Sequence, residues 1–273
     1  MEHDTSRMAL SSATSPTRRC VQVCGLPFDV LDTVAVVHAL CVAIRDGRHL
    51  FLSTPNLNFL VTAQRDAVFR QSVVESDLSV ADEPPDTLLG LYQGTPLPER
   101  VAGSTLFDQL RAGAGQAVLG RGIKVYFFGG PPGVAQQACE RLNAEHAAGR
   151  GQMRCVGWHT PGFGPVEQMA APEVIAAINA SGADFLVVAL GAQKGQAWIL
   201  QKRARLQVPV VSHLGAVVNF VAGTVQRAPP AWQRWGLEWL WRIRQEPQLF
   251  KRYWGDGWAL LGLAVRALGQ RGR

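Results

Sequence analysis

Motifs for metal binding and redox chemistry are missing from this 273-residue chain. Five cysteines are too few and too scattered for a disulfide framework, and without a CxxC pair a zinc ribbon is excluded, so we expect free thiols. The six histidines show no HExxH or other paired spacing, and no zinc site is expected. The GxSxG elbow of serine hydrolases is also lacking.

Long apolar segments are scarce as well. Residues 1–19 are rich in Ser, Thr, Arg and acidic residues and lack the apolar run of a secretory signal, so a disordered N-terminal segment is predicted there. The longest uncharged stretch, residues 206–226, could cross a bilayer by length alone. It contains Pro209, His213 and Asn219, and its valine-rich start is typical of a buried strand, so we exclude a transmembrane helix.

Basic charge and tryptophan are concentrated at the end of the chain. Residues 225–273 hold nine basic and three acidic residues, which accounts for the entire net charge of +6, and six of the eight tryptophans. Tryptophan interleaved with arginine on a predicted helix favours a membrane interface, where indoles sit at headgroup depth and cations meet anionic lipid. A nucleic-acid patch and an ordinary solvated helix are the alternatives.

The rest of the chain alternates between strand-like and helix-like patterns. Helical spacing over residues 33–44, 57–71, 134–147 and 173–180 separates apolar strands at 21–23, 48–53, 78–81, 122–128, 153–157, 185–190 and 208–211. This alternation predicts an α/β fold with a largely parallel, Rossmann-like sheet and flanking helices. We assign residues 20–224 to this domain and 225–273 to a basic, Trp-rich helical C-terminal appendage.

Loops at the carboxyl ends of parallel strands are the usual place for ligands, which directs attention to residues 54–58, 82–86, 129–133 and 191–196. The glycine-rich loop 129–133 could cradle a nucleotide phosphate or form a simple tight turn. Thr54, Asn56 and Asn58 could bind sugar or base edges or cap a helix.

Two charged residues extend this set. Asp82 follows an apolar strand and could act as a general base or as a turn or cap residue. Arg100 could bind a diphosphate through its guanidinium fork or pair with Glu99 on the surface. Residues 23–27 lack the glycine fingerprint of a dehydrogenase or methyltransferase, and no DxD-type acid pair follows a predicted strand to hold Mg²⁺.

Several short motifs, in order, resemble the WecG/TagA/CpsF family of bacterial glycosyltransferases. The resemblance covers roughly residues 20–254 and is strongest near the C-terminus. The segments that carry it are TPN (54–56), DLSVAD (77–82), ERVAG (99–103), FGGPPGV (128–134), LGAQKGQAW (190–198), RAP (227–229), GLEWL (236–240), EP (246–247) and RY (252–253).

Membership would imply inverting transfer of a sugar from a UDP-sugar donor to a polyprenyl-diphosphate-linked acceptor, in bacterial surface or exopolysaccharide synthesis. By position, the resemblance makes Asp82 the catalytic base. It implies donor binding by Thr54, Asn56, Arg100, Gly129, Gly130 and Gln196, the last being one residue from the usual glutamine. It implies acceptor-diphosphate and membrane binding by Arg227, Arg234, Arg242 and Arg252.

The resemblance also implies a place in the cell and a set of partners. The protein is expected to be cytoplasmic and peripheral on the inner face of the cytoplasmic membrane, with no nucleic-acid partner, and a homo-oligomer is compatible with the sequence. No cofactor is expected, because arginine and main-chain amides would replace a metal at the leaving diphosphate. A catalytically silent nucleotide-sugar-binding protein of the same fold is the alternative.

Overall fold

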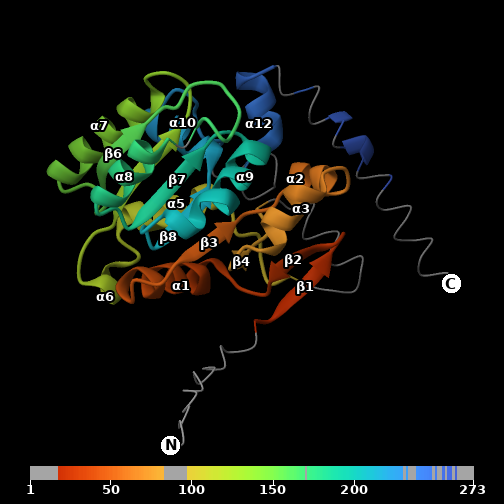
Figure 1. The fold of residues 1–273 in the computed structure, drawn as a ribbon, viewed down its shortest axis with the longest axis horizontal. Helices are drawn as coiled ribbons and strands as arrows, with labels where there is room; N and C mark the ends of the chain where they lie inside the picture. Colours follow the sequence, from red (N-terminus) through yellow and green to blue (C-terminus); the bar gives the residue numbers. More distant parts are fainter. Residues whose placement is uncertain are drawn as a thin grey trace, which may run out of the picture.

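The computed structural model describes residues 18–82, 97–169 and 171–229 and, in the C-terminal part, 232, 238–247, 250, 254–255, 257–259 and 262. Its centre is a six-stranded parallel sheet in the order β4-β3-β8-β7-β5-β6 (Figure 1). The strands are β3 (Leu50–Ser53), β4 (Leu78–Ser79), β5 (Lys124–Gly129), β6 (Arg154–His159), β7 (Phe185–Ala189) and β8 (Val210–His213). The predicted α/β fold with a Rossmann-like parallel sheet is confirmed.

The central strands are largely apolar and buried, because helices cover both faces of the sheet. In β5, Val125 and Phe127 pack on one face and Tyr126 and Phe128 on the other. This alternation is the period of two that an extended strand imposes on its side chains. The continuous hydrophobic runs seen in the sequence therefore mark buried strands.

One face of the sheet is covered by α1 (Thr33–Arg45), α5 (Gly103–Ala112), α7 (Val134–Ala147) and α10 (Gly215–Ala222). The opposite face is covered by α8 (Pro172–Ala180) and α9 (Ala192–Lys202), where the indole of Trp198 is fully buried. The short α6 (Gln116–Leu119) and the 3-10 helix η1 (Arg203–Arg205) complete the connections. The core thus consists of two apolar layers separated by the sheet.

An antiparallel hairpin precedes the sheet in the sequence, and only its first strand was predicted. The strand predicted at residues 21–23 is β1 (Cys20–Val23), and it pairs with β2 (Leu26–Asp29). The buried Asp29 carboxylate accepts hydrogen bonds from Arg18 Nε (2.7 Å) and from the Ser79 N–H (2.7 Å), which attaches the hairpin to β4. Residues 1–17 of the predicted N-terminal segment lie outside the described residues.

The single helix predicted over residues 57–71 is wrong, because the chain forms two helices there. These are α2 (Leu57–Ala63) and α3 (Ala67–Val74). Asp66 begins the second helix, since its side chain accepts a hydrogen bond from the Phe69 N–H (2.9 Å). The break lets Phe59 and Phe69 pack edge to face, 5.0 Å apart, against the hairpin.

The expectation that all thiols are free is also wrong. Cys139 on α7 and Cys155 on β6 form a disulfide, whereas Cys20, Cys24 and Cys41 are free. The two half-cystines are 16 residues apart in sequence. They meet because α7 returns the chain directly to β6, which packs beside it.

In the C-terminal part, the structure describes one helix long enough to delimit, α12 (Glu238–Gln245), in keeping with the predicted helical appendage (Figure 1). Residues 206–226 form β8 and α10 and the turns around them. Within the described residues, no helix combines the length and apolar character needed to span a bilayer.

Gly129 allows β5 and β7 to approach closely where the two strands end. Its φ is +105°, and a Cβ there would lie 2.6 Å from the main-chain oxygen of Ala189. We expect Gly129→Ala to lower the free energy of unfolding by about 3 kcal/mol, because backbone strain adds to a clash with main chain. Denaturant-induced unfolding measures the change.

Gly133→Ala is the matched control. Gly133 also has a positive φ (+79°), but nothing lies within 4 Å of the position of its Cβ. Only the conformational cost of about 1 kcal/mol is expected there. If both variants lose the same free energy of unfolding, the close approach of β5 and β7 is not the reason for glycine at position 129.

Candidate active site

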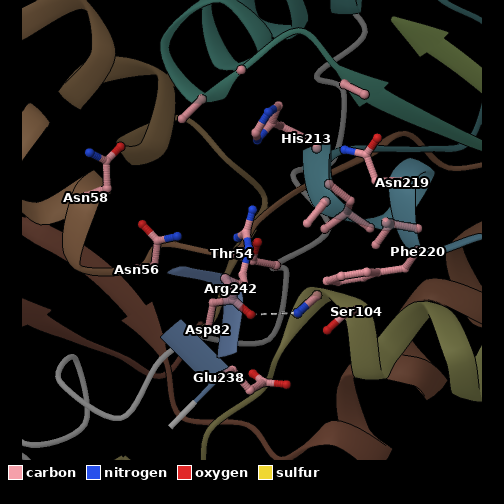
Figure 2. Close-up of a pocket in the computed structure, with 18 of the residues that line it drawn as sticks. Thr54, Asn56, Asn58, Asp82, Ser104, His213, Asn219, Phe220, Glu238 and Arg242 are labelled. Carbon is pink, nitrogen blue, oxygen red and sulfur yellow. Dashed lines mark hydrogen bonds between the residues drawn. The ribbon is translucent and has the colours of Figure 1, made fainter. Parts of the chain in front are cut away.

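A cavity of about 350 Å³ opens at the carboxyl edge of the parallel sheet (Figure 2). Residues that follow β3, β4, β5, β7 and β8 line it, together with the first turn of α5, part of α10 and two residues of α12. Its polar lining residues are Thr54, Asn56, Asn58, Asp82, Arg100, Ser104, His213, Asn219, Glu238 and Arg242. The cavity is therefore where the sequence placed it, at the strand ends.

Asp82 lies in this cavity at the N-terminal end of α5. The Gly103 N–H donates to Asp82 Oδ1 (2.9 Å; Figure 2, dashed line), and the Asp82 N–H donates to the Pro55 carbonyl (3.0 Å). The helix itself begins after Ala102, which provides no side-chain cap. Asp82 therefore caps the N-terminus of α5 with a carboxylate from outside that helix. The same carboxylate faces the cavity.

The surroundings of Asp82 raise its pKa above the ordinary value. Burial is the largest cause, because a charged carboxylate loses hydration there. Arg100 and the Gly103 N–H oppose burial, the negative charge of Glu238 adds to the rise, and Arg242 opposes it. A carboxylate with a raised pKa binds a proton more strongly and is a stronger base when it is ionised.

Arg100 links Asp82 to the C-terminal helix. Its Nε donates to the Asp82 carbonyl oxygen (2.6 Å), and its Nη2 forms an ion pair with the Glu238 carboxylate of α12. The neighbouring Val101 N–H donates to the Ala81 carbonyl (2.7 Å), which holds this segment beside β4. Arg100 is therefore a cavity residue, and its described ion-pair partner is Glu238 rather than Glu99, which bonds to Thr33.

Thr54 and Asn56 both line the cavity, as predicted for donor-binding residues. Asn56 also caps α2, because its side chain accepts a hydrogen bond from the Phe59 N–H (3.2 Å). The Thr54 side chain is buried against the first turn of α5, where a Cβ on Gly103 would lie 3.3 Å from Thr54 Oγ1. The loop after β3 therefore both caps a helix and lines the cavity, and both predicted roles apply.

The two predicted loop glycines occupy different environments. Gly130 lines the cavity, whereas Gly129 ends β5 against Ala189 and is not among the lining residues. Gln196 is fully buried in α9, where its amide hydrogen-bonds with the Ser53 hydroxyl (Nε2 to Oγ, 3.1 Å). The structure therefore does not bring Gln196 to the cavity, because helical periodicity turns it toward the end of β3.

Two of the four arginines predicted to bind the acceptor, Arg227 and Arg242, are described, and they lie at different places. Arg242 lines the cavity from α12, and its Nε is buried without a hydrogen-bond partner. Arg227 instead joins α5, through an ion pair with Asp108 and a hydrogen bond to Thr105 Oγ1 (2.7 Å). Arg234 and Arg252 lie outside the described residues.

Four polar residues of the cavity were not assigned from the sequence: Ser104, His213, Asn219 and Glu238. His213 was not predicted as a site residue because the predicted strand ended at Val211, whereas β8 continues to His213. Burial lowers the pKa of His213 to about 4, which keeps the imidazole neutral at physiological pH. Glu238 lies within the GLEWL segment that contributed to the family resemblance, which was the available signal.

The two ends of the cavity differ in charge. Asp82, Arg242 and Glu238 lie near one another, while His213 lies well away from Asp82 and Glu238 (Figure 2). Among the described residues, no group of three or more His, Cys, Asp or Glu side chains is arranged to hold a metal ion. Asp82 can accept a proton, the guanidinium groups of Arg100 and Arg242 can bind an anion, and the region around the neutral His213 suits uncharged polar groups.

Comparison with protein families agrees with this architecture. Residues 21–273, nearly the whole chain, match the glycosyl transferase WecG/TagA/CpsF family. The match includes the sheet, every segment that lines the cavity and the C-terminal part that contains α12. The chain therefore belongs to the WecG/TagA/CpsF family of glycosyl transferases.

Proposed function

We propose that this protein transfers a sugar from a UDP-sugar to a polyprenyl-diphosphate-linked acceptor with inversion at the anomeric carbon. Membership of a glycosyl transferase family gives the reaction class, sugar transfer in cell-surface polymer synthesis. The observation that carries the finer proposal is the position and environment of Asp82. Its carboxylate lines the cavity at the strand ends, has a raised pKa, and is flanked by Arg100 and Arg242.

In the proposed reaction, ionised Asp82 accepts the proton of the acceptor hydroxyl. The hydroxyl oxygen attacks the anomeric carbon from the face opposite UDP and forms the new glycosidic bond. The bond from the anomeric carbon to the diphosphate oxygen breaks, and its electron pair leaves with UDP. One carboxylate is sufficient for this single displacement, and binding both substrates in one cavity supplies much of the acceleration.

Cationic groups are needed where the diphosphate departs. Arg100 lines the cavity, and its fork geometry suits phosphate oxygens. Arg242 brings a second positive charge from α12, and Gly130 lies where main-chain groups can approach a ligand closely. These groups support a donor site that works without metal, with Thr54 and Asn56 beside it and the neutral His213 suited to an uncharged part of the donor.

The exposed aromatic residues of the C-terminal part support docking to the inner face of the cytoplasmic membrane. Trp254 and Trp258 are 60% and 64% exposed, and Phe250 is 52% exposed. Such a cluster with excess basic charge favours an anionic lipid surface over nucleic acid.

Replacing Asp82 tests the base. We expect Asp82→Asn to reduce sugar transfer by about 10²- to 10⁴-fold, because the amide cannot accept the proton, while UDP binding remains. A panel of UDP-sugars with a lipid-diphosphate-sugar acceptor, scored by UDP release, measures transfer, and calorimetry measures UDP binding. Asp46→Asn, at an exposed position of the turn after α1, is the control.

Full activity of the Asp82→Asn enzyme would remove Asp82 from this role. The same assay separates an enzyme from a silent nucleotide-sugar-binding protein of this fold. The silent protein would bind UDP and release none from any UDP-sugar in the panel.

Replacing the exposed tryptophans tests membrane docking. We expect Trp254→Ala/Trp258→Ala to lower partitioning onto phosphatidylglycerol-containing vesicles at least about tenfold, since two large apolar side chains lose their burial in lipid. Binding of the unaltered protein should also weaken as salt increases from about 0.1 to 1 M. Phe163→Ala, which removes a 93% exposed ring in the loop after β6, is the control, and an equal effect there would contradict the proposal.

A further inference from the structure

We propose that Glu238 is a positioning residue for the transfer reaction. It holds the Arg100 guanidinium against the main chain of Asp82 and offsets its charge, so that the Asp82 carboxylate remains a strong base. The inference rests on the proposed role of Asp82 and assigns a role to a residue of α12 that the reaction scheme above leaves without one.

The geometry places Arg100 between two acidic residues. Its Nε donates to the Asp82 carbonyl oxygen at 2.6 Å, and its Nη2 pairs with the Glu238 carboxylate. The Arg100 and Glu238 side chains are 21% and 20% exposed, so water screens this pair less than a surface ion pair. Glu238 thereby fixes the orientation of the guanidinium relative to Asp82.

The charges around Asp82 come from both walls of the cavity. Arg100 and the Gly103 N–H favour its ionised form from the segment that leads into α5. On α12, Arg242 also favours the ionised form, and only Glu238 opposes it. His213, at the end of β8, is neutral above about pH 5 because burial lowers its pKa to about 4. Glu238 is thus the negative charge that balances Arg100, whereas Arg242 pairs with Glu246 (3.6 Å).

Removing that negative charge has a predictable sign. Without it, Arg100 and Arg242 stabilise the Asp82 carboxylate more strongly, and the pKa of Asp82 falls. A carboxylate with a lower pKa takes the acceptor proton less readily, so the rate at neutral pH decreases. The acid limb of the pH–rate profile moves to lower pH, because activity is lost as pH falls through the Asp82 pKa.

Anchoring of α12 does not depend on Glu238 alone. Trp241 Nε1 and Gln245 Nε2 both donate to the Gln226 carbonyl oxygen, at 3.1 and 2.7 Å. A Glu238→Gln substitution keeps the shape of the side chain and removes only its charge. The variant therefore separates an electrostatic role from a structural one.

The test is a titration of Asp82 in the full-length protein labelled with ¹³C at the aspartate carboxyl groups. The Asp82 resonance is the one that disappears in Asp82→Asn, and the label distinguishes its titration from that of His213. We expect the midpoint in Glu238→Gln to lie about 1 pH unit below that of the unaltered protein. The pH–rate profile should move by the same amount.

Two further variants complete the design. Glu238→Asp keeps the charge and should bring the midpoint back toward that of the unaltered protein. Glu145→Gln removes the acid of a comparable ion pair, with Arg111, that is not part of the cavity, and it should leave the midpoint unchanged.

A midpoint in Glu238→Gln equal to or above that of the unaltered protein would overturn the inference, as would reduced activity with an unshifted pH–rate profile. The proposed function fails separately. If Asp82→Asn retains transfer, Asp82 is not the base whatever the titration shows. If Asp82→Asn is inactive and the midpoint does not move, only the role of Glu238 is rejected.

Discussion

Burial of the Asp82 carboxylate at the N-terminal end of α5 is the constraint on which the rest of the site depends. An ionised carboxylate removed from water needs partners, and the Gly103 N–H provides one at 2.9 Å. A Cβ on Gly103 would lie 2.5 Å from Leu214 Cδ2, so a larger residue there would require the Leu214 side chain to move. The position of α5, the strength of the base and the shape of the cavity are therefore linked through one hydrogen bond.

The parallel sheet determines where these groups meet. In the order β4-β3-β8-β7-β5-β6, strands distant in sequence lie side by side, and their carboxyl ends share one edge. Thr54 after β3, Asp82 after β4 and His213 at the end of β8 face the same cavity for this reason. Burial on both faces of the sheet keeps that edge rigid, which favours a preorganised site.

The C-terminal part gives α12 two connections to the rest of the molecule. Glu238 pairs with Arg100 beside the cavity, and Trp241 and Gln245 hydrogen-bond to Gln226. In the same part of the chain, Trp254 and Trp258 present their rings to solvent. Under the proposed function, this part of the chain would both complete the cavity and dock to lipid, which would couple docking to assembly of the site.

The amino-acid sequence by itself determined the α/β class, the strand ends that form the site, and Thr54, Asn56, Asp82, Arg100, Gly130 and Arg242 as residues of the cavity. The fold class and the strand ends follow from hydrophobic periodicity, whereas Arg242 was implied by the family resemblance of short motifs. Both signals are local properties of the chain. Only the tertiary structure decided that Gln196 faces Ser53, that Cys139 joins Cys155, that Arg227 binds α5 and that Glu238 pairs with Arg100. Such pairings depend on how helices pack on the sheet, and Arg100 and Glu238 are 138 residues apart, so no pattern within a short window could reveal them.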